Sequence, residues 1–425
     1  MQDHMRRWVR QWPWLRRPAR ALYRQGRFWQ ARALGRLRQD ALRPLYVDPL
    51  AITKSIARDD PALTGSGLAH LGTVAGGDWD LSGVPVSEHD GVYNILRARQ
   101  VDGRDWHDIP AYRANLARIA AGQIVDSAAT AAEYEARWAK TEALYKQIAA
   151  EGYLSQAELA GEAGNEAAGA INEVRVQIGR RGELLFEEGL HRLAIAQLLE
   201  LPQIPVLVTR RHAQWAGLRD AVIKIVAQRG FFHQPFDHPD LDCLNDWYGS
   251  ELAHTAVYGD ERWPVLRDAA LGLDYTAATV LDIGAYFGAF CHHFEEAGFS
   301  CTAVEPDPVN LDVLRRWRLI KGKTFAVRDC SIFDLEETHF DIVLALNVFH
   351  HFVRTREDYE RLTVFLQRLE CGALFFEPDS NAGIAGAYRQ FDDEAFIAFV
   401  LEHSGLQEAQ LLGRAREGRN VYLLT

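Results

Sequence analysis

The sequence predicts an α/β protein whose C-terminal third is a parallel sheet connected by helices. Three observations lead to this prediction. From residue 276 onward, short apolar runs alternate with helical patterns, which is the arrangement of β-α-β units. The chain has 425 residues, more than one hydrophobic core usually serves, so two or three domains are expected. Its hydrophobic content of 48% and charged content of 25% are those of an ordinary globular protein.

The composition also excludes several classes of protein. No stretch reaches the roughly 20 uninterrupted apolar residues that a membrane-spanning helix needs. The cysteines are odd in number and show no CxxC spacing, so neither a disulfide framework nor a metal site is predicted. They are typical of reduced thiols in a cytoplasmic protein. The cysteines are Cys243, Cys291, Cys301, Cys330 and Cys371.

Residues 1–46 form a basic arm that differs from the rest of the chain. The arm holds twelve arginines, no lysine and two acids, whereas the remainder of the chain is strongly acidic. The arginines are accompanied by Trp8, Trp12, Trp14, Tyr23 and Trp29. Such a segment is typical of peripheral contact with an anionic membrane face, here the inner one, or with nucleic acid. Docking on the acidic remainder of the same chain and an organellar transit peptide are the alternatives. A secretory signal is not expected, because arginine interrupts every apolar run.

The pattern beyond the arm indicates four further segments. Residues 47–165 are expected to be irregular and mostly helical, with one long exposed helix over 126–151. Residues 166–215 indicate a strand, an Arg-Arg-Gly turn, a second strand, a short helix and a third strand. Residues 216–270 are expected to be a helical connector, and residues 271–425 form the predicted α/β domain.

The segment TVLDIGAYFGAF predicts a strand, a tight turn and the start of a helix. Gly284 and Gly288 allow a ligand to approach the backbone and the helix N-terminus, while Tyr286 stands where a third glycine is common. The second strand ends at Glu305, whose carboxylate can accept both hydroxyls of a ribose. Asp282 can receive the ammonium of a methionyl tail, whereas a nicotinamide dinucleotide has little use for an acid there. A sulfonium nucleoside therefore suits the loop better than a pyrophosphate.

Further polar residues follow the next three apolar strands. Asp329, next to Cys330, comes after the third strand and can accept a hydrogen bond from an adenine amino group. The fourth strand ends near Asn347, within ALNVFHHF, and the fifth ends at Glu377. Because the carboxyl ends of parallel strands meet at one edge of a sheet, these side chains are expected on the side that binds ligands.

This order of landmarks resembles the class I S-adenosylmethionine-dependent methyltransferases over about residues 270–425. The resemblance implies a Rossmann-like, doubly wound sheet of seven strands, with the final strand GRNVYLLT as its antiparallel edge. Tyr286 departs from the family's usual glycine and could roof the cofactor or the substrate. The cofactor-binding residues that the resemblance implies are Asp282, Gly284, Tyr286, Gly288, Glu305, Asp329, Cys330 and Asn347.

Catalysis of methyl transfer depends mainly on alignment, because the sulfonium is already activated. A hydroxyl acceptor gains from a general base, worth about 10²–10⁴ in rate, and the candidates are His350, His351 and Glu377. For each histidine, capping or packing is an equal alternative. The sequence lacks the Asn/Asp-Pro-Pro-Tyr/Phe and Pro-Cys motifs of DNA base methylation. O-methylation of a small-molecule, lipid or glycan acceptor is therefore expected.

The middle segment contains the sequence pattern of an anion-binding helix start. A strand ends in Glu187-Glu188-Gly189, and His191 and Arg192 open a helix whose free amides attract negative charge. This segment resembles the ParB/sulfiredoxin-like superfamily, which implies a small α+β domain that binds nucleoside phosphates. The resemblance suggests ATP or another nucleotide with Mg²⁺ at a kinase-like site, where either glutamate positions the metal or acts as base. A structural His-Arg pair is the alternative.

Together these features predict a methyltransferase with an accessory nucleotide-binding domain. A sharper hypothesis is that one chain phosphorylates an acceptor and methylates either that acceptor or the new phosphate. The alternative function is a regulatory or nucleic-acid-binding protein that senses S-adenosylmethionine without turnover. Two segments, GGDWD and DGRDWHD, fit sugar-binding or metal sites, but turns beside buried tryptophans are the favoured interpretation.

Overall fold

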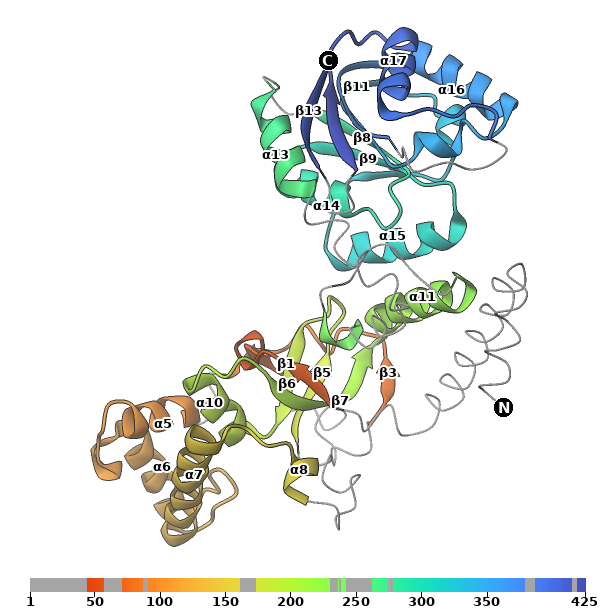
Figure 1. Cartoon of the computed structure of the whole chain (residues 1–425). Coiled ribbons are helices and arrows are strands. Elements are labelled where there is room, and N and C mark those ends of the chain that lie inside the picture. The colour runs from red at the N-terminus through yellow and green to blue at the C-terminus, as the bar shows by residue number, and fades with distance from the viewer. Residues whose placement is uncertain are drawn as a thin grey trace, which may run out of the picture. The chain divides into compact units, whose positions relative to one another are not determined.

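The computed structural model of the chain describes residues 44–56, 71–86, 91–160, 173–229, 236, 238–241, 262–273, 275, 278–378, 387–414 and 419–425. The chain forms two compact units (Figure 1), residues 1–219 with 237–243 and residues 220–236 with 244–425. Nearly all of the basic arm lies outside the described residues. The binding partner of the arm therefore stays a prediction. The predicted segment boundaries also stay predictions.

The second unit contains a seven-stranded sheet in the order β10-β9-β8-β11-β12-β14-β13. The first five strands in this order are parallel, and β14 runs antiparallel to both of its neighbours. The predicted Rossmann-like sheet is thereby confirmed. Its strands are β8 (Thr279–Ile283), β9 (Ser300–Val304), β10 (Ala326–Arg328), β11 (His339–Leu346), β12 (Glu370–Glu377), β13 (Ala409–Arg414) and β14 (Asn420–Leu424).

One detail of the predicted sheet is wrong. The final strand was expected at the edge, but β14 lies between β12 and β13, and β13 is the edge strand. The reason is burial. Val421 and Leu424 of β14 are 3% and 0% exposed, so this strand is covered on both faces. The side chains of β13 are mostly exposed, which suits an edge.

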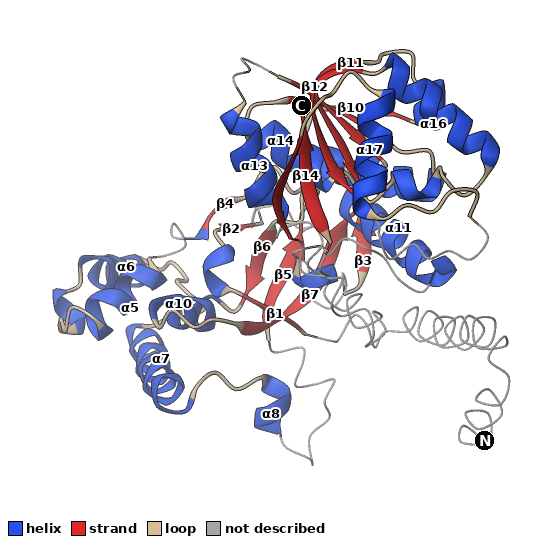
Figure 2. Cartoon of the chain, turned by 45° about the horizontal axis from the view of Figure 1, so that its top comes forward, coloured by secondary structure: helices blue, strands red, loops and turns tan. Residues whose placement is uncertain are grey.

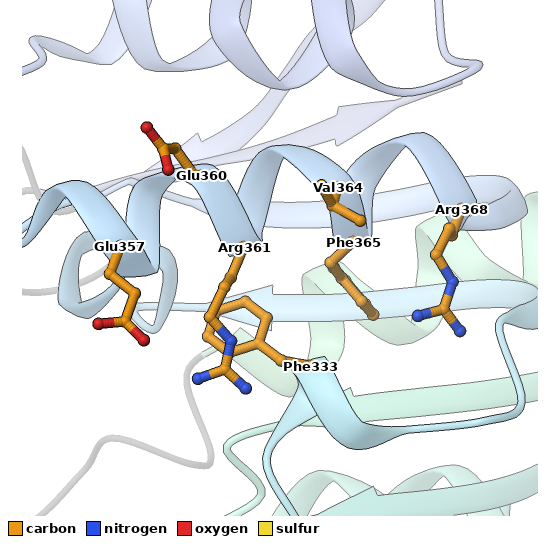
Figure 3. A pocket seen from close by; sticks show the side chains of 7 residues that line it. All are labelled: Phe333, Glu357, Glu360, Arg361, Val364, Phe365 and Arg368. Carbon is orange, nitrogen blue, oxygen red and sulfur yellow. The ribbon is translucent and has the colours of Figure 1, made fainter.

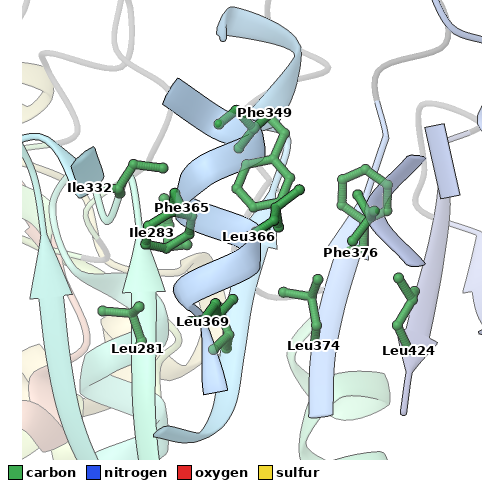
Figure 4. Close-up of a cluster of buried hydrophobic side chains, with 14 of the residues drawn as sticks. Leu281, Ile283, Ile332, Phe349, Phe365, Leu366, Leu369, Leu374, Phe376 and Leu424 are labelled. Atoms are coloured by element: carbon green, nitrogen blue, oxygen red, sulfur yellow. The ribbon is translucent and has the colours of Figure 1, made fainter. Parts of the chain in front are cut away.

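Helices cover both faces of this sheet (Figure 2). On one face, α13 (Arg262–Gly272), α14 (Ala289–Glu296) and α15 (Pro308–Ile320) share a core with Val280 and Leu344. On the other face, α16 (Arg356–Arg368) and α17 (Asp393–His403) bury a second cluster, part of which is shown in Figure 4. Successive residues of β8, Val280 and Leu281, belong to different cores, because side chains alternate along a strand. The sheet is therefore doubly wound.

The first unit is built on a second, mixed sheet in the order β1-β7-β5-β6-β2-β4, with β3 also paired to β7. The predicted succession of strand, turn, strand, short helix and strand in the middle segment is confirmed by β5, β6, α10 and β7. The sequence pattern did not indicate the short strands that precede them. The elements are β1 (Leu45–Val47), β2 (Lys54–Ser55), β3 (Thr73–Ala75), β4 (Val84–Pro85), β5 (Val174–Ile178), β6 (Leu184–Glu188), α10 (Leu190–Leu198) and β7 (Ile204–His212).

A tight turn between β5 and β6 depends on Gly182. Its φ is 87°, and a Cβ atom there would lie 2.5 Å from the Trp215 ring. Trp215 belongs to α11 (Ala213–Arg229), and its indole donates to the buried Asp240 carboxylate over 2.9 Å. Asp240 also accepts from Arg211. The glycine of the predicted Arg-Arg-Gly turn is therefore required by its conformation and by the packing of α11.

A helical layer adjoins this second sheet. Its longest helix, α7, begins after Thr130, which forms a capping box with Glu133. The helix was expected to be exposed, but its Tyr134 and Trp138 are buried in an aromatic core shared with Trp106. No helix in the described ranges is long and apolar enough to cross a bilayer. The layer contains η2 (Pro49–Ala51), α5 (Val92–Gln100), η4 (Trp106–Asp108), α6 (Pro110–Ala120), α7 (Ala131–Glu151) and α8 (Gln156–Ala160).

The GGDWD segment has a structural role. Asp80 is 5% exposed and accepts hydrogen bonds from the backbone amide and the guanidinium of Arg180. Asp78 accepts a further bond from the same guanidinium over 2.7 Å. Trp79 packs near the Arg210 guanidinium, 5.7 Å from its ring centroid. These contacts attach the segment to the β5–β6 turn.

Candidate functional site

The loop between β8 and α14 has the backbone conformation that its glycines predict. Gly284 and Gly288 have φ values of 69° and 83°, and Gly288 is the N-cap of α14. A Cβ atom would lie 3.0 Å from Val348 at the first position and 3.3 Å from Phe325 at the second. The Gly284 amide donates to the Val304 carbonyl over 2.9 Å. This bond fixes the start of the loop against β9.

Tyr286 shows why a third glycine is dispensable in this loop. Its φ is 56°, in the left-handed region, which costs an ordinary residue about 1–2 kcal/mol. Its ring stacks on that of Phe287, with centroids 3.9 Å apart and an interplanar angle of 23°. Phe287 is fully buried, so the stack attaches the tyrosine to the core. Stacking therefore offsets part of the conformational cost.

Glu305 follows β9 and is 5% exposed. Its Oε2 accepts from the Tyr286 amide at 2.8 Å, and its Oε1 accepts from the Asp307 amide at 3.0 Å and from Asn310 Nδ2 at 3.3 Å. Burial raises the pKa of Glu305 above its ordinary value, although these three hydrogen bonds act in the opposite direction. A carboxylate offers about four acceptor positions, so Oε2 has room for a ribose hydroxyl.

Asp282 lies near the end of β8 and is 4% exposed. The pKa of Asp282 is raised to about 7, mainly by burial and further by the charge of Glu305. The Cys291 thiol, which donates to the carboxylate over 3.7 Å, and the charge of Arg262 act in the opposite direction. A carboxyl that is half protonated near neutral pH gains its charged form when a cation binds beside it. The ammonium of a methionyl group fits this requirement.

Asp329 and Cys330 follow β10, on the far side of Glu305 from Asp282. The Glu305 amide donates to the Arg328 carbonyl over 3.1 Å, which joins the two strand ends. The Asp329 side chain is 64% exposed and pairs with Arg315 at 3.0 Å. The hydrogen bond from Arg315 holds the pKa of Asp329 below its ordinary value. Cys330 is half-buried and packs on the core.

The polar segment after β11 forms η6 (Phe349–His351). Asn347 has a φ of 56°, which asparagine tolerates better than most residues, and its amide donates to the Glu377 carbonyl over 3.1 Å. The rings of His350 and His351 lie 3.9 Å apart. His350 is 7% exposed, whereas His351 is open to solvent. The structure therefore distinguishes two neighbours that the sequence could not.

Glu377 ends β12 and is 1% exposed, between two arginines. Its Oε2 forms an ion pair with Arg262, at the start of α13, and its Oε1 lies 3.6 Å from Arg419. The Arg262 guanidinium also lies over the Phe290 ring, 5.1 Å from the centroid. Sequence reasoning missed both arginines, because neither lies near Glu377 in the chain. The catalytic role of Glu377 stays a prediction.

The predicted cofactor and catalytic residues thus follow neighbouring strand ends. Asp282 is the penultimate residue of β8, and Glu377 is the last residue of β12. Glu305, Asp329 and Asn347 directly follow β9, β10 and β11. These five strands are parallel, so their carboxyl ends share one edge of the sheet, where ligands bind in folds of this kind.

A cavity of about 300 Å³ lies elsewhere, between α16 and η5 (Ile332–Asp334) (Figure 3). Figure 3 shows Arg361 beside the Phe333 ring, and the guanidinium lies 4.5 Å from the ring centroid. Arg368 donates to the Leu335 carbonyl over 3.4 Å. None of the predicted cofactor or catalytic residues lines this cavity.

The predicted accessory site begins as the sequence indicates. Glu187 and Glu188 end β6, and Gly189 is the N-cap of α10 with a φ of 98°. A Cβ atom on Gly189 would lie 3.1 Å from the backbone of Val174. The strand, the glycine and the short helix therefore form the predicted geometry.

The side chains around this helix start pair with one another. His191 Nε2 lies 3.0 Å from the Asp126 carboxylate, and Arg192 lies 3.9 Å from the buried Glu173. Glu188 forms an ion pair with the guanidinium of Arg175, and Glu187 accepts a hydrogen bond from Gln177 over 3.1 Å. The described residues contain no group of three His, Cys, Asp or Glu that could hold a metal. An anion here would meet basic groups that already face carboxylates.

Comparison with known proteins identifies the C-terminal part. Residues 257–378 match the family model of a methyltransferase domain. No curated protein matches the sequence. Together with the strand order, the family match shows that this part is a class I S-adenosylmethionine-dependent methyltransferase domain. The likeness of the middle segment to the ParB/sulfiredoxin-like superfamily stays a prediction.

Several solved structures resemble the chain in fold alone. The bifunctional kinase-methyltransferase WbdD is 21% identical, the match covers 48% of this chain and 46% of WbdD, and the TM-score is 0.38. The N-terminal domain of EvdMO1 with SAH bound is 17% identical over 39% of this chain and 78% of that one, with a TM-score of 0.30. The PH0226 protein from Pyrococcus horikoshii OT3 is 11% identical over 42% of this chain and 99% of that one, with a TM-score of 0.33. The match spans less than half of WbdD.

Proposed function

We propose that the chain transfers the methyl group of S-adenosylmethionine to a hydroxyl of a small-molecule, lipid or glycan acceptor. One arrangement carries this proposal. Asp282 and Glu305, both buried, lie at the carboxyl ends of the adjacent parallel strands β8 and β9. One carboxylate suits the ammonium and the other suits the ribose of a single sulfonium nucleoside. Bound S-adenosylmethionine supplies an activated methyl group, so the protein chiefly aligns the acceptor.

We assign the general base to His351. A base must reach the acceptor hydroxyl, and of the two neighbouring histidines only His351 is exposed. As the hydroxyl oxygen bonds to the methyl carbon, the bond from that carbon to sulfur breaks and the hydroxyl proton passes to His351. S-adenosylhomocysteine and the methyl ether are the products. His350, 7% exposed, supports the position of its neighbour through the ring contact.

The proposal is tested by product formation with the full chain. The protein is incubated with S-adenosylmethionine labelled on its methyl group and with separate panels of sugars, lipids and lipid-linked glycans. We expect S-adenosylhomocysteine and a labelled acceptor from one panel, and no product from the double variant Asp282→Ala, Glu305→Ala. Absence of S-adenosylhomocysteine binding in calorimetry would overturn the proposal. Tight binding without turnover on any panel would instead favour a sensor of the cofactor.

A kinase-like activity at the accessory site, with ATP and Mg²⁺, stays a separate prediction. The paired charges at His191 and Arg192 do not favour it. Calorimetric titration of the full chain with ATP in the presence of Mg²⁺ tests it, and no heat of binding would contradict it. Peripheral membrane contact through residues 1–46 is likewise proposed from composition. Co-sedimentation with anionic and neutral vesicles tests it, and equal recovery with both would contradict it.

A further inference from the structure

Arg229, the last residue of α11, is connected by hydrogen bonds to the proposed cofactor site. It belongs to the second compact unit but precedes the part of the chain that matches the methyltransferase family. Its guanidinium donates to Asn310 Oδ1 over 2.7 Å and to Asp307 Oδ2 over 2.6 Å. The side chain is 28% exposed, so solvent reaches this ion pair only in part. Arg229 thus binds two residues at the start of α15.

Both of these residues donate to the same oxygen of Glu305. The Asp307 amide and Asn310 Nδ2 reach Glu305 Oε1 at 3.0 and 3.3 Å. Asp307 is also the N-cap of α15, and its Oδ1 accepts from the Val309 amide over 2.9 Å. Although partial burial opposes ionisation, the hydrogen bond from Arg229 and the backbone amides hold the pKa of Asp307 below its ordinary value. The arginine therefore stabilises the charged cap.

The contact with Asn310 fixes the orientation of a side-chain amide. Asn310 is 7% exposed, with its oxygen toward Arg229 and its nitrogen toward Glu305. An amide whose oxygen faced Glu305 would place two acceptors against each other. The planar guanidinium favours the productive orientation because it donates to the Asn310 oxygen and the Asp307 carboxylate together. Lysine, a point charge on a flexible stem, cannot match this fork.

We propose that Arg229 is a positioning residue, which acts through Asn310 and Asp307 to hold the Glu305 carboxylate in the orientation that accepts the cofactor ribose. This inference rests on the proposed function of the strand-end site. It extends that site beyond the matched domain to the end of α11. Recognition of the ribose then depends on a residue that touches neither the cofactor nor the glycine loop.

The test compares two ligands on the full chain by calorimetry: S-adenosylhomocysteine and its analogue without the two ribose hydroxyls. In the native protein we expect the analogue to bind at least tenfold more weakly. In Arg229→Gln we expect S-adenosylhomocysteine to bind about tenfold more weakly than in the native protein, and the preference for hydroxyls to fall to about twofold. For Arg229→Lys, the affinity for S-adenosylhomocysteine and the preference for the hydroxyls should lie between those of the native protein and those of Arg229→Gln. The ratio of the two dissociation constants does not depend on the fraction of protein that is folded.

Two further variants separate positioning from general damage. Arg316→Gln removes an exposed ion pair with Asp312 on α15, the helix whose start Arg229 contacts. This variant should leave the affinities for both ligands unchanged. In a Glu305→Gln background, Arg229→Gln should add little, because its target is already altered. Undiminished preference for the hydroxyls in Arg229→Gln overturns the inference and leaves the proposed function intact. Failure of the native protein to bind S-adenosylhomocysteine defeats the proposed function itself.

Discussion

The backbone amide of Tyr286 donates a hydrogen bond to the Glu305 carboxylate over 2.8 Å. The donor lies in the middle of the glycine loop and the acceptor lies at the end of the next strand. Because the donor is a backbone group, the bond depends on the left-handed conformation at this position rather than on the tyrosine ring. The shape of the loop and the position of the ribose-binding acid are therefore set together.

Substitutions of Tyr286 test this dependence on backbone conformation. Tyr286→Gly should change the free energy of unfolding by less than about 1 kcal/mol, since glycine adopts positive φ freely but loses the stack on Phe287. Tyr286→Val should cost about 1–2 kcal/mol or more, because a β-branched residue is disfavoured there. Urea unfolding measures both, and equal stability of the two variants would contradict the argument.

The affinity for S-adenosylhomocysteine should depend on pH through Asp282. Its pKa, raised by burial to about 7, leaves the carboxyl largely protonated at pH 6 and ionised at pH 8. An ammonium binds the ionised form, so the affinity should rise about tenfold between pH 6 and 8 and then level off. Calorimetry measures the dissociation constants. Asp282→Asn should bind weakly at every pH, and an unchanged pH profile in this variant would exclude Asp282 as the cause.

The same group makes the ligand-free protein less stable as the pH rises. The folded pKa of Asp282 lies above its unfolded value, so the folded state binds more protons between about pH 4 and 7. The contribution of Asp282 to the free energy of unfolding is fully present below about pH 4 and decreases as the pH rises through this window. Above pH 7 it is lost, and the total decrease is at most about 4 kcal/mol. Asp282→Asn should therefore unfold at higher urea than the native protein at pH 8. Lower stability of the variant at that pH would refute this sign.

The ion pair between Arg262 and Glu377 should contribute to the stability of the second unit. Arg262→Met leaves a carboxylate that is 1% exposed, with the Arg419 guanidinium 3.6 Å away. Breaking a buried pair from one side costs about 3–5 kcal/mol, and we expect the lower end because Arg419 remains. The matched control is Arg267→Met on the same helix, whose pair with Asp268 is exposed and contributes less than about 1 kcal/mol. Equal urea unfolding midpoints for Arg262→Met and Arg267→Met would contradict the expectation.

The two histidines after β11 should respond differently to substitution. His351→Gln should lower kcat for a hydroxyl acceptor about 10²–10⁴-fold and leave cofactor affinity unchanged, because only proton transfer is lost. His350→Gln should mainly lower stability, since its ring is 7% exposed. Steady-state kinetics and thermal unfolding of both variants separate these effects. If His350→Gln loses activity at full stability while His351→Gln does not, the two roles are reversed.

The strand ends could be predicted from sequence because their signals are local. Glu305 and Glu377 directly follow apolar runs, Asp329 comes one residue after one, and glycines mark the loop after Asp282. Parallel strands bring such positions to one edge, so the order of motifs was enough to place them. The position of β14 was mispredicted because the resemblance placed the final strand at the edge, whereas its apolar run, buried at Val421 and Leu424, suits an interior strand.

The partners of these acids could not be predicted because they are distant in the chain. Arg262 lies far before Glu377, and Arg229 lies far before Asp307, so no spacing connects them. At the accessory helix start, the sequence indicated the glycine and the basic residues. It could not show that His191 faces Asp126, because that contact depends on tertiary packing.

The interior place of β14 has a consequence for folding during synthesis. Its register joins Leu374 to Leu424 on one side and Leu411 to Tyr422 on the other, so among the described strands β13 is connected to the sheet through β14. Until residues 420–424 leave the ribosome, β12 presents an apolar edge of unpaired amides and carbonyls, and β13 has no place to dock. An unpaired apolar strand edge is a template for another chain. A nascent chain stalled before these residues is therefore expected to aggregate.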